Sequence, residues 1–415
     1  MRSSLVGLLA ASIVLPLAAH AAPLAGRWDG VFHGGRGDQA VTLVCRPGDA
    51  GGLEGLLYMS GDLVGPLENG HIDGDSLRFN VMNFACRALR RGEQMSVELS
   101  IAHGRSHELS LRFASPDTAP LAQSPEALAA ARARTIVPWD QVPDSVFAKH
   151  HLAAATPLGI ADAMRTGTLL LVGGGPAQED VNAEFVRLAG GASGHIVVIP
   201  TAAVDPGKDA EALAGAERWA RALGVPHVTV LHTSSRKEAD SDAFVRPLLD
   251  ATGVWLPGGE AGRILVSYLG TRTERELLAV LARGGVIGGT SAGALVWGSE
   301  VLTFRAPKDA SPYQMGDVTA LRLDDPHAVG FGALRQVVIA PHFTEFRMQP
   351  SLVKAVASRP QLLGIGIDEA SALEVHGTVG AVLGRGHVTV VAAGATAPQV
   401  LSAGTRYDIV RHAVL

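Results

Sequence analysis

The stretch GGVIGGTSAGALVWGS, residues 284–299, carries Ser291 between small residues, where an apolar strand pattern changes to a helix-like one. Small residues on both sides of a hydroxyl suit a sharp strand-to-helix turn, because the backbone must pass close to neighbouring strands. Residues 289–293 (GTSAG) fit the G-x-S-x-G nucleophile elbow. The alternative is an ordinary strand-to-helix turn. A base, an orienting acid and an oxyanion hole would favour the nucleophile.

Short apolar runs alternate with helix-like stretches throughout residues 166–415. The predicted strands lie at 169–172, 196–199, 228–231, 253–256, 286–287, 337–340 and 364–367. Near-continuous apolar strands separated by helices indicate a parallel sheet covered on both faces. In such sheets the chemistry lies beyond the carboxyl ends of the strands, which is where Ser291 falls.

Other predicted strand ends carry the residues that an elbow serine needs. His342 and Glu369 each follow a predicted strand closely, as a base and its orienting acid would have to do to meet Ser291. The paired glycines after strand 253–256 can aim the N–H of Gly259 outward, and together with the N–H of Ala292 this predicts an oxyanion hole. Each residue also has an ordinary alternative: a histidine at a strand end is often a surface or core residue, and the acid can cap the next segment.

Composition excludes several classes of function. The chain has 35 Lys+Arg against 40 Asp+Glu and no basic run with interleaved aromatics, so nucleic-acid binding is unsupported. Gly173, Gly174 and Gly175 begin like a dinucleotide fingerprint, but Gln178 stands where its third glycine is needed, so no nucleotide cofactor is expected. We expect these glycines to let the chain turn over a strand end. No zinc-ligand spacing occurs, and no metal is expected.

The first 21 residues are typical of an export signal. Arg2 supplies the positive end, residues 5–17 the apolar stretch and residues 19–21 (AHA) a small-x-small cleavage site. We therefore expect an exported protein, periplasmic or secreted, without a membrane span. In an oxidising compartment Cys45 and Cys86 could form one disulfide, with buried thiols as the alternative.

The rest of the sequence divides into two segments that differ in composition and in hydrophobic pattern. Residues 22–115 alternate short strands with turns and predict a small antiparallel β-domain. Residues 116–165 are rich in proline around an alanine-rich stretch at 127–134, which could be a short helix, and are expected to form a linker that packs in part. The sequence leaves a homodimer open.

Several separate motifs occur in the order of one known family. They include GTLLLVGGG at 167–175, IVVIPTA at 196–202, GTSAGA at 289–294, HF at 342–343 and GIGIDE at 364–369. In this order, the sequence resembles the cyanophycinase and dipeptidase E family of serine peptidases over nearly all of 166–415. The resemblance implies an α/β fold of the class I glutamine-amidotransferase-like (flavodoxin-like) type, a parallel sheet sandwich, preceded here by the β-domain.

The resemblance also implies roles for individual residues. It makes Ser291 the nucleophile, His342 the general base and then acid, and Glu369 the orienting acid, with Asp368 and Glu345 in reserve. No metal or organic cofactor is implied, and the partner is a peptide substrate.

The sequence departs from cyanophycinases at positions that bear on substrate recognition. The family's Asp-Gln, glutamine and arginines are replaced by Ala340, Pro341, Ala261, Phe346 and Met348. The charged groups left near the expected site, as candidates for substrate binding, are Glu260, Arg263 and Arg347.

These departures favour a peptidase for short aspartyl or isoaspartyl peptides. A cyanophycinase proper, cleaving the β-Asp-Arg polymer, and a non-catalytic binding protein on the same fold are the alternatives.

Overall fold

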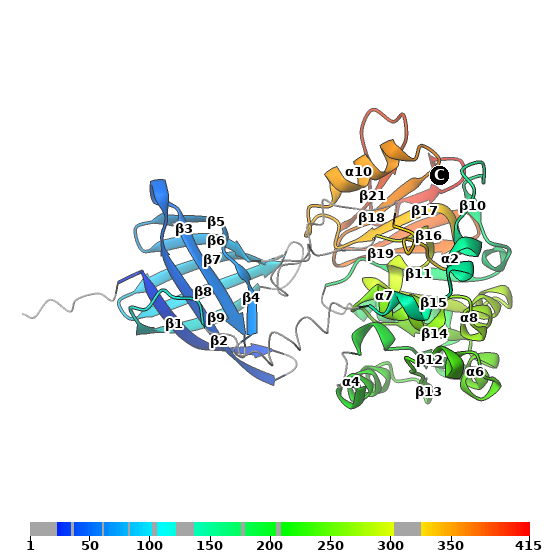
Figure 1. The fold of residues 1–415 in the computed structure, drawn as a ribbon, viewed down its shortest axis with the longest axis horizontal. Helices are drawn as coiled ribbons and strands as arrows, with labels where there is room; N and C mark the ends of the chain where they lie inside the picture. Colours follow the sequence, from blue (N-terminus) through cyan, green and yellow to red (C-terminus); the bar gives the residue numbers. More distant parts are fainter. Residues whose placement is uncertain are drawn as a thin grey trace, which may run out of the picture. The chain divides into compact units, whose positions relative to one another are not determined.

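The structure, a computed structural model, divides the chain into two compact units, with a boundary after Leu121 (Figure 1). It describes residues 23–34, 37–59, 62–81, 84–101, 106–121, 137–175, 179–204, 209–302 and 325–415. The expected export signal and the helix considered at 127–134 lie outside these residues. Within the described ranges, no helix combines the length and apolar character that crossing a bilayer requires.

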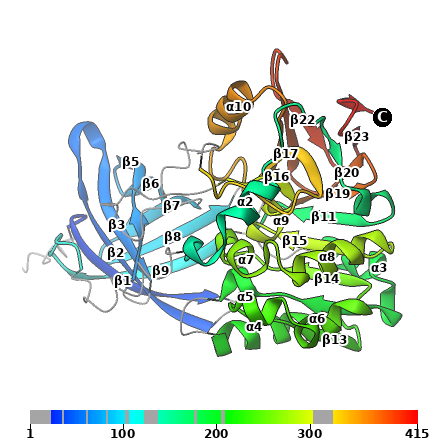
Figure 2. The ribbon, with the colours of Figure 1, turned by 45° about the vertical axis from the view of Figure 1, so that its right-hand side comes forward.

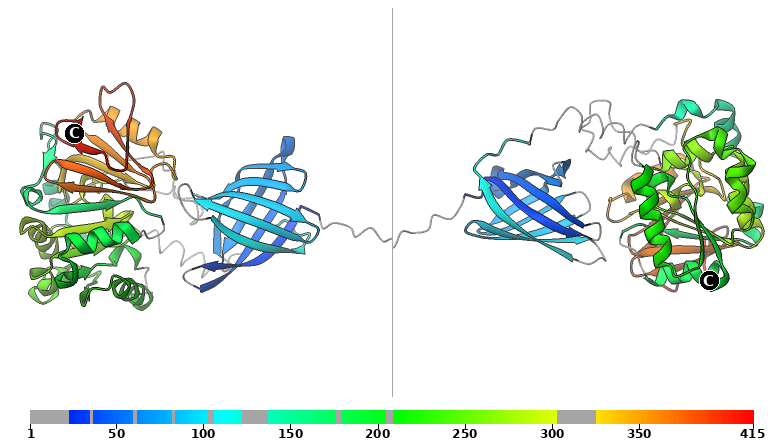
Figure 3. Two further views of the ribbon diagram at one scale, coloured as in Figure 1. Left: turned by 180° about the vertical axis from the view of Figure 1, so that it is seen from behind. Right: turned by 90° about the horizontal axis from the view of Figure 1, so that it is seen from below.

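The first unit is a nine-stranded antiparallel sheet in the order β4-β3-β2-β1-β9-β8-β7-β6-β5. Its strands are β1 (Gly26–Gly34), β2 (Gly37–Pro47), β3 (Leu53–Met59), β4 (Asp62–Pro66), β5 (Glu68–Asp73), β6 (Ser76–Val81), β7 (Phe84–Arg91), β8 (Gln94–Ile101) and β9 (Ser106–Ser115). The sheet curls until an antiparallel bridge joins Gly52 to His71, which makes it nearly a barrel (Figure 3). This confirms the predicted antiparallel β-domain.

Alternation of side chains builds the interior of this unit. In β6, Leu77, Phe79 and Val81 are buried while Ser76 and Arg78 are exposed. Successive strand residues point to opposite faces, so this two-residue period places the three apolar side chains of β6 inside.

The proposed disulfide is absent from the structure. Cys45 on β2 and Cys86 on β7 are buried and form no disulfide, and three strands separate β2 from β7 along the sheet. The Cys45 thiol donates to the carbonyl of Leu24 at 3.5 Å. Burial raises the pKa of both thiols to about 12. Of the two alternatives that the sequence left open, the structure shows the buried thiols, because β2 and β7 are not neighbours in the nine-stranded sheet.

The second unit contains a nine-stranded mixed sheet, the main sheet, in the order β13-β12-β14-β15-β11-β19-β20-β23-β24. Its strands are β11 (Thr168–Val172), β12 (His195–Val198), β13 (His227–Val230), β14 (Gly253–Leu256), β15 (Val286–Thr290), β19 (Ser371–His376), β20 (Val379–Gly384), β23 (Arg406–Asp408) and β24 (Ala413–Val414). The five strands from β13 to β11 are parallel, and β19 continues the sheet antiparallel to β11.

Helices cover both faces of the parallel part (Figure 2). The helices of this unit are α2 (Asp144–His150), α3 (Glu179–Leu188), α4 (Asp209–Ala222), α5 (Arg236–Ala239), α6 (Asp242–Leu249), α7 (Ala261–Tyr268), α8 (Arg272–Ala282), α9 (Ala292–Leu295) and α10 (Gln349–Ser358). Leu170 and Val172 pack with Phe185 of α3, while Leu169 and Leu171 belong to the larger core that includes α6, α7 and α8. Burial on both faces explains the uninterrupted apolar runs of these strands.

A second sheet holds the strands that precede the predicted base and acid. Its order is β10-β17-β18-β21-β22, from β10 (Gly159–Ile160), β17 (Leu334–Pro341), β18 (Leu363–Ile367), β21 (His387–Ala392) and β22 (Gln399–Ser402), with β16 (Gly298–Glu300) also pairing with β17. The expectation of one parallel sheet is therefore corrected to two mixed sheets. An apolar run shows that a strand is buried, but it does not show which sheet the strand joins.

Much of the expected linker is part of the second unit. Val142, Phe147 and Met164 are buried in its core, and β10 pairs with β17. Residues 137–165 therefore pack against the second unit. Apolar residues between the prolines of this segment pack against the core.

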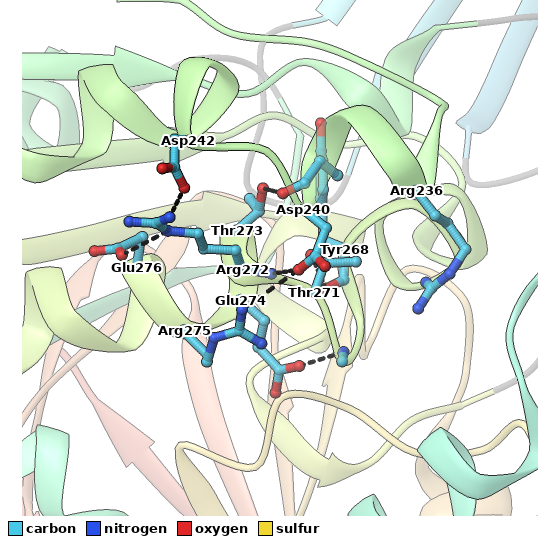
Figure 4. Close-up of polar contacts among 12 residues, drawn as sticks. Arg236, Asp240, Asp242, Tyr268, Thr271, Arg272, Thr273, Glu274, Arg275 and Glu276 are labelled. Carbon is cyan, nitrogen blue, oxygen red and sulfur yellow. Dashed lines mark hydrogen bonds and ion pairs between the residues drawn. The ribbon is translucent and has the colours of Figure 1, made fainter.

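The helices around the start of α8 share a dense polar network, which we call the helical corner (Figure 4). It comprises Arg236, Asp240, Asp242, Tyr268, Thr271, Arg272, Thr273, Glu274, Arg275 and Glu276. The Arg236 guanidinium donates to the carbonyls of Val266 and Leu269 at 2.6 and 2.7 Å, and Glu274 accepts from the N–H of Gly270. These bonds satisfy backbone groups that helix ends leave without partners.

Candidate active site

Ser291 lies between β15 and α9 in a strained backbone conformation. Its φ is 54° and its ψ is −117°, backbone angles that residues other than glycine rarely adopt. Its N–H donates to the carbonyl of Val172 at 3.0 Å, which ties the turn to β11. A Cβ at Gly293 would lie 2.0 Å from the carbonyl oxygen of Leu256, so only glycine fits there. The GTSAG stretch thus has the strand–turn–helix geometry that the motif requires.

Hydrogen bonds join Ser291, His342 and Glu369 in a row. The Nε2 atom of His342 is 2.8 Å from the Oγ of Ser291, and its Nδ1 is 2.7 Å from Oε1 of Glu369. His342 follows β17 and Glu369 follows β18, so the second sheet brings base and acid to a serine of the main sheet. The Glu369 side chain is only 2% exposed, which leaves the imidazole as the solvent-facing end of the pair.

The two reserve acids lie at different places. Asp368 accepts from the N–H and hydroxyl of Thr344 at 3.1 and 2.6 Å and from the N–H of His387 at 3.2 Å. Glu345 accepts from the N–H of Glu369 at 3.1 Å, and burial, reinforced by its acidic neighbours, raises the pKa of its carboxyl. Asp368 and Glu345 therefore brace the turn around the site, whereas Glu369 alone of the three bonds the imidazole in the structure.

The glycine run after β11 lies against the imidazole and its acid. The carbonyl of Gly173 accepts from the N–H of His342 at 2.7 Å, and the carbonyl of Gly174 accepts from the N–H of Ala370 at 3.3 Å. A Cβ on Gly174 would lie 2.1 Å from Cε1 of His342. The sequence predicted a turn at these glycines but missed this close approach, for which the failed dinucleotide fingerprint was the only signal.

Of the two predicted oxyanion-hole residues, Ala292 directly follows Ser291, and Gly259 directly follows a residue that lies beside it. Ala292 is the first residue of α9, a position whose N–H has no acceptor within its own helix. A Cβ built on Gly258 would be 3.0 Å from the Cβ of Ser291, so the segment leading to Gly259 passes directly beside the serine. Gly259 itself has a φ of 144°.

The three charged residues predicted to bind substrate lie on two segments. The carboxylate of Glu260 accepts from the N–H of Gly262 at 3.0 Å and so caps α7, while burial raises the pKa of this carboxyl. Arg263 donates to the carbonyl of Ala202 at 3.3 Å. Arg347 is exposed in the turn after His342, with a φ of 51°. Glu260 and Arg263 therefore lie on the segment that follows Gly259. Arg347 lies on a different segment, five residues after His342.

Sequence reasoning missed the position of Phe346 beside the imidazole. The rings of Phe346 and His342 are stacked, with centroids 4.6 Å apart and planes 14° from parallel. Of the departures noted above, Ala340, Pro341 and Met348 are buried, whereas Phe346 and Ala261 are partly exposed. The aromatic residue thus contributes to the surface of the site.

Comparison with known protein families matches residues 169–382, more than half of the chain, to Peptidase family S51. The chain belongs to peptidase family S51. The match contains Ser291, His342 and Glu369 and begins within β11. The family makes the chain a peptidase and therefore a hydrolase.

Curated relatives in this family are named cyanophycinases. Those of Synechococcus elongatus and Nostoc sp. are each 30% identical, over 233 and 236 residues; both alignments cover 54% of this chain, and 68% and 74% of the relative.

Solved structures similar to this chain include a peptidase from an acI-B1 actinobacterium. It is 27% identical, covers 59% of this chain and 97% of its own, and has a TM-score of 0.47. A putative peptidase E protein from Listeria monocytogenes is 18% identical, covers 52% and 98%, and has a TM-score of 0.37.

Proposed function

We propose that this S51 peptidase is a serine hydrolase that cleaves short aspartyl or isoaspartyl peptides through an acyl-enzyme. The observation that carries the proposal is the row of two hydrogen bonds from the Oγ of Ser291 through His342 to Glu369, at 2.8 and 2.7 Å. A partly exposed serine at an elbow, a base in contact with it and a buried acid behind the base are the parts that nucleophilic catalysis requires.

The proposed reaction proceeds in two halves. The Oγ of Ser291 attacks the scissile carbonyl carbon while Nε2 of His342 takes the hydroxyl proton, and the Glu369 carboxylate stabilises the resulting imidazolium through Nδ1–H. The N–H groups of Ala292 and Gly259 would stabilise the oxyanion. His342 then donates its proton to the leaving amine as the C–N bond breaks. In the second half, His342 takes a proton from a water molecule whose oxygen attacks the acyl carbon, and it then donates that proton to the Oγ of Ser291 as the ester bond breaks.

The charged groups support a small substrate with free ends. Arg263 and Arg347 are candidates for a substrate carboxylate, and Glu260 for an amino group, because charge-assisted hydrogen bonds are the strongest available to short peptides. The relatives named cyanophycinases favour the β-Asp-Arg polymer as the second candidate substrate. The replacement of a charged position by Phe346 beside His342 argues against it, since an aromatic ring carries no charge to form charge-assisted hydrogen bonds with the polymer's charged groups.

Steady-state kinetics on matched substrates test this proposal. The purified protein is given aspartyl dipeptides, isoaspartyl dipeptides and cyanophycin, and Ser291→Ala is the control. We expect the highest kcat/KM on a dipeptide and no turnover by Ser291→Ala. A kcat/KM on cyanophycin above every dipeptide would favour the cyanophycinase alternative, and no Ser291-dependent turnover of any substrate would favour the non-catalytic binding protein.

A further inference from the structure

The turn that follows His342 presents an aromatic ring to the imidazole. The N–H of Phe346 donates to the carbonyl of His342 at 2.8 Å, the contact of one helical turn, which puts both side chains on the same side. Their rings are stacked with centroids 4.6 Å apart. Phe346 is partly exposed, so part of its ring remains available to another molecule.

This ring lies close to where the leaving group must be. In the proposed mechanism Nε2 of His342 gives its proton to the leaving nitrogen, which must approach to about 3 Å. The next carbon of the leaving residue is about 1.5 Å farther along the chain. Its side chain therefore starts within a few ångströms of the imidazole and can reach the ring of Phe346.

Among the residues that the structure describes, the three carboxylates in and beside this turn, those of Glu345, Asp368 and Glu369, are engaged within the protein. Asp368 and Glu369 are 2% and 1% exposed, and both are held by the hydrogen bonds described above. Glu345 uses Oε2 to accept from the N–H of Glu369, and its Oε1 is buried. A cationic leaving residue would therefore meet an aromatic ring and, during proton transfer, a positively charged imidazolium.

We infer that Phe346 is a specificity-determining residue that selects an apolar side chain, such as leucine or phenylalanine, on the leaving-group side of the scissile bond. This inference rests on the proposed serine-hydrolase function. An apolar side chain gains free energy by covering the exposed part of the ring, whereas an arginine in the same place would bring a second positive charge near the imidazolium.

Dipeptides that differ only in the leaving residue test the inference. Aspartyl and isoaspartyl dipeptides ending in Leu, Phe, Ala or Arg are compared by kcat/KM on the full chain. We expect Leu and Phe to exceed Ala about tenfold, the size of discrimination that a few methylene groups provide, and Arg not to exceed Ala. In Phe346→Ala the Leu-to-Ala ratio should fall to about two or less, while Phe346→Leu, the matched apolar control, should keep most of it.

The outcomes separate this inference from the proposed function. Turnover that depends on Ser291 but favours Arg over Leu, or a Leu-to-Ala ratio unchanged in Phe346→Ala, overturns the inference alone. No Ser291-dependent turnover overturns both. The wild-type ratios decide the matter even if Phe346→Ala fails to fold, because they require no variant.

Discussion

The second unit contains two clusters of polar side chains that differ in backbone conformation. In the active site, Ser291 and His342 have φ values of 54° and 51°, and Gly174 beside them has 104°. In the helical corner of Figure 4, every labelled residue has ordinary negative φ, and the side chains bind helix ends and each other. Strained backbone costs about 1–3 kcal/mol per residue and persists only where the surroundings impose it.

This difference separates polar groups that stabilise the fold from those available for chemistry. Arg236 caps the end of α7 through two carbonyls, and Thr273 donates to the carbonyl of Ala239 at 2.6 Å. The hydroxyl of Ser291 instead meets a partly exposed imidazole. We therefore expect substitutions in the active site to change rate more than stability, and substitutions in the helical corner to do the reverse.

The largest expected effect is on the general base. His342→Asn removes the proton acceptor while suiting the left-handed backbone at this position, because asparagine tolerates positive φ. We expect kcat/KM to fall by about 10⁴-fold or more, with the midpoint of urea unfolding changed little. A variant that retains a tenth of the wild-type rate would exclude His342 as the base.

The next effect distinguishes neighbouring acids. Glu369→Gln should lower kcat by about 10³–10⁴-fold, because only this residue fixes the imidazole tautomer and stabilises its positive charge. Asp368→Asn should lower kcat less than tenfold but destabilise the turn by about 1–3 kcal/mol through its contacts with Thr344 and His387. Glu345→Gln should likewise lower kcat less than Glu369→Gln. The reverse ranking of rates would assign the orienting role to Asp368 or Glu345.

In the helical corner, Glu274→Gln should act on stability. Glu274 is buried and joins Nε2 of His150 at 2.8 Å to the start of α8, so the variant should lose about 1–3 kcal/mol of unfolding free energy with kcat/KM within about twofold. Glu276→Gln on the same helix is the matched control, expected within about 0.5 kcal/mol because its partner Arg272 is at 3.4 Å and partly exposed. Tryptophan fluorescence follows the transition, since four of the five tryptophans lie beyond residue 137. A large loss of kcat/KM in Glu274→Gln would contradict the expectation that substitutions in the helical corner change stability rather than rate.

The smallest effect is a pH dependence of stability at His150. Burial alone lowers its pKa, but the hydrogen bond and charge of Glu274, with the carbonyl of Val146, raise it above the usual value. A raised folded pKa means that this contribution is fully present below the unfolded pKa of about 6.5 and is lost as pH rises through the folded value. Unfolding free energies of wild type and His150→Gln should therefore converge as pH rises from 5 to 9. A difference that grows with pH would contradict this sign.

The sequence located the strands of the second unit better than it located the sheets that they join. Ser291, His342 and Glu369 each follow an apolar run, and in the structure they follow the ends of β15, β17 and β18 within two residues. Few residues lie so close after a strand end, so these candidates could be picked out from the sequence. The division into two sheets could not be predicted, because both β11 and β17 contain a buried apolar run, and strand pairing is decided by contacts far apart in sequence. The same limit applies to residues 137–165, where the prolines predicted a linker that packs in part but did not show that Phe147 is buried in the core.

Local pattern also could not assign the detailed roles around the imidazole. Asp368 and Glu369 are adjacent, and only the fold shows that the first bonds Thr344 and the second His342. The stacking of Phe346 depends on the turn after β17, which has no strong sequence signal. Gly174 was predicted at a turn, but its contact with the imidazole comes from the other sheet.

In the proposed mechanism, Ser291 is a nucleophile activated by His342. Mass spectrometry of the folded protein after reaction with a fluorophosphonate tests it most directly, with Ser291→Ala and His342→Asn treated in parallel. We predict one adduct on the peptide that contains Ser291 in wild type, none in Ser291→Ala and strongly slowed labelling in His342→Asn. Cleavage of peptides by a wild-type protein that forms no adduct at Ser291, or equal labelling of Ser291→Ala, would contradict the account.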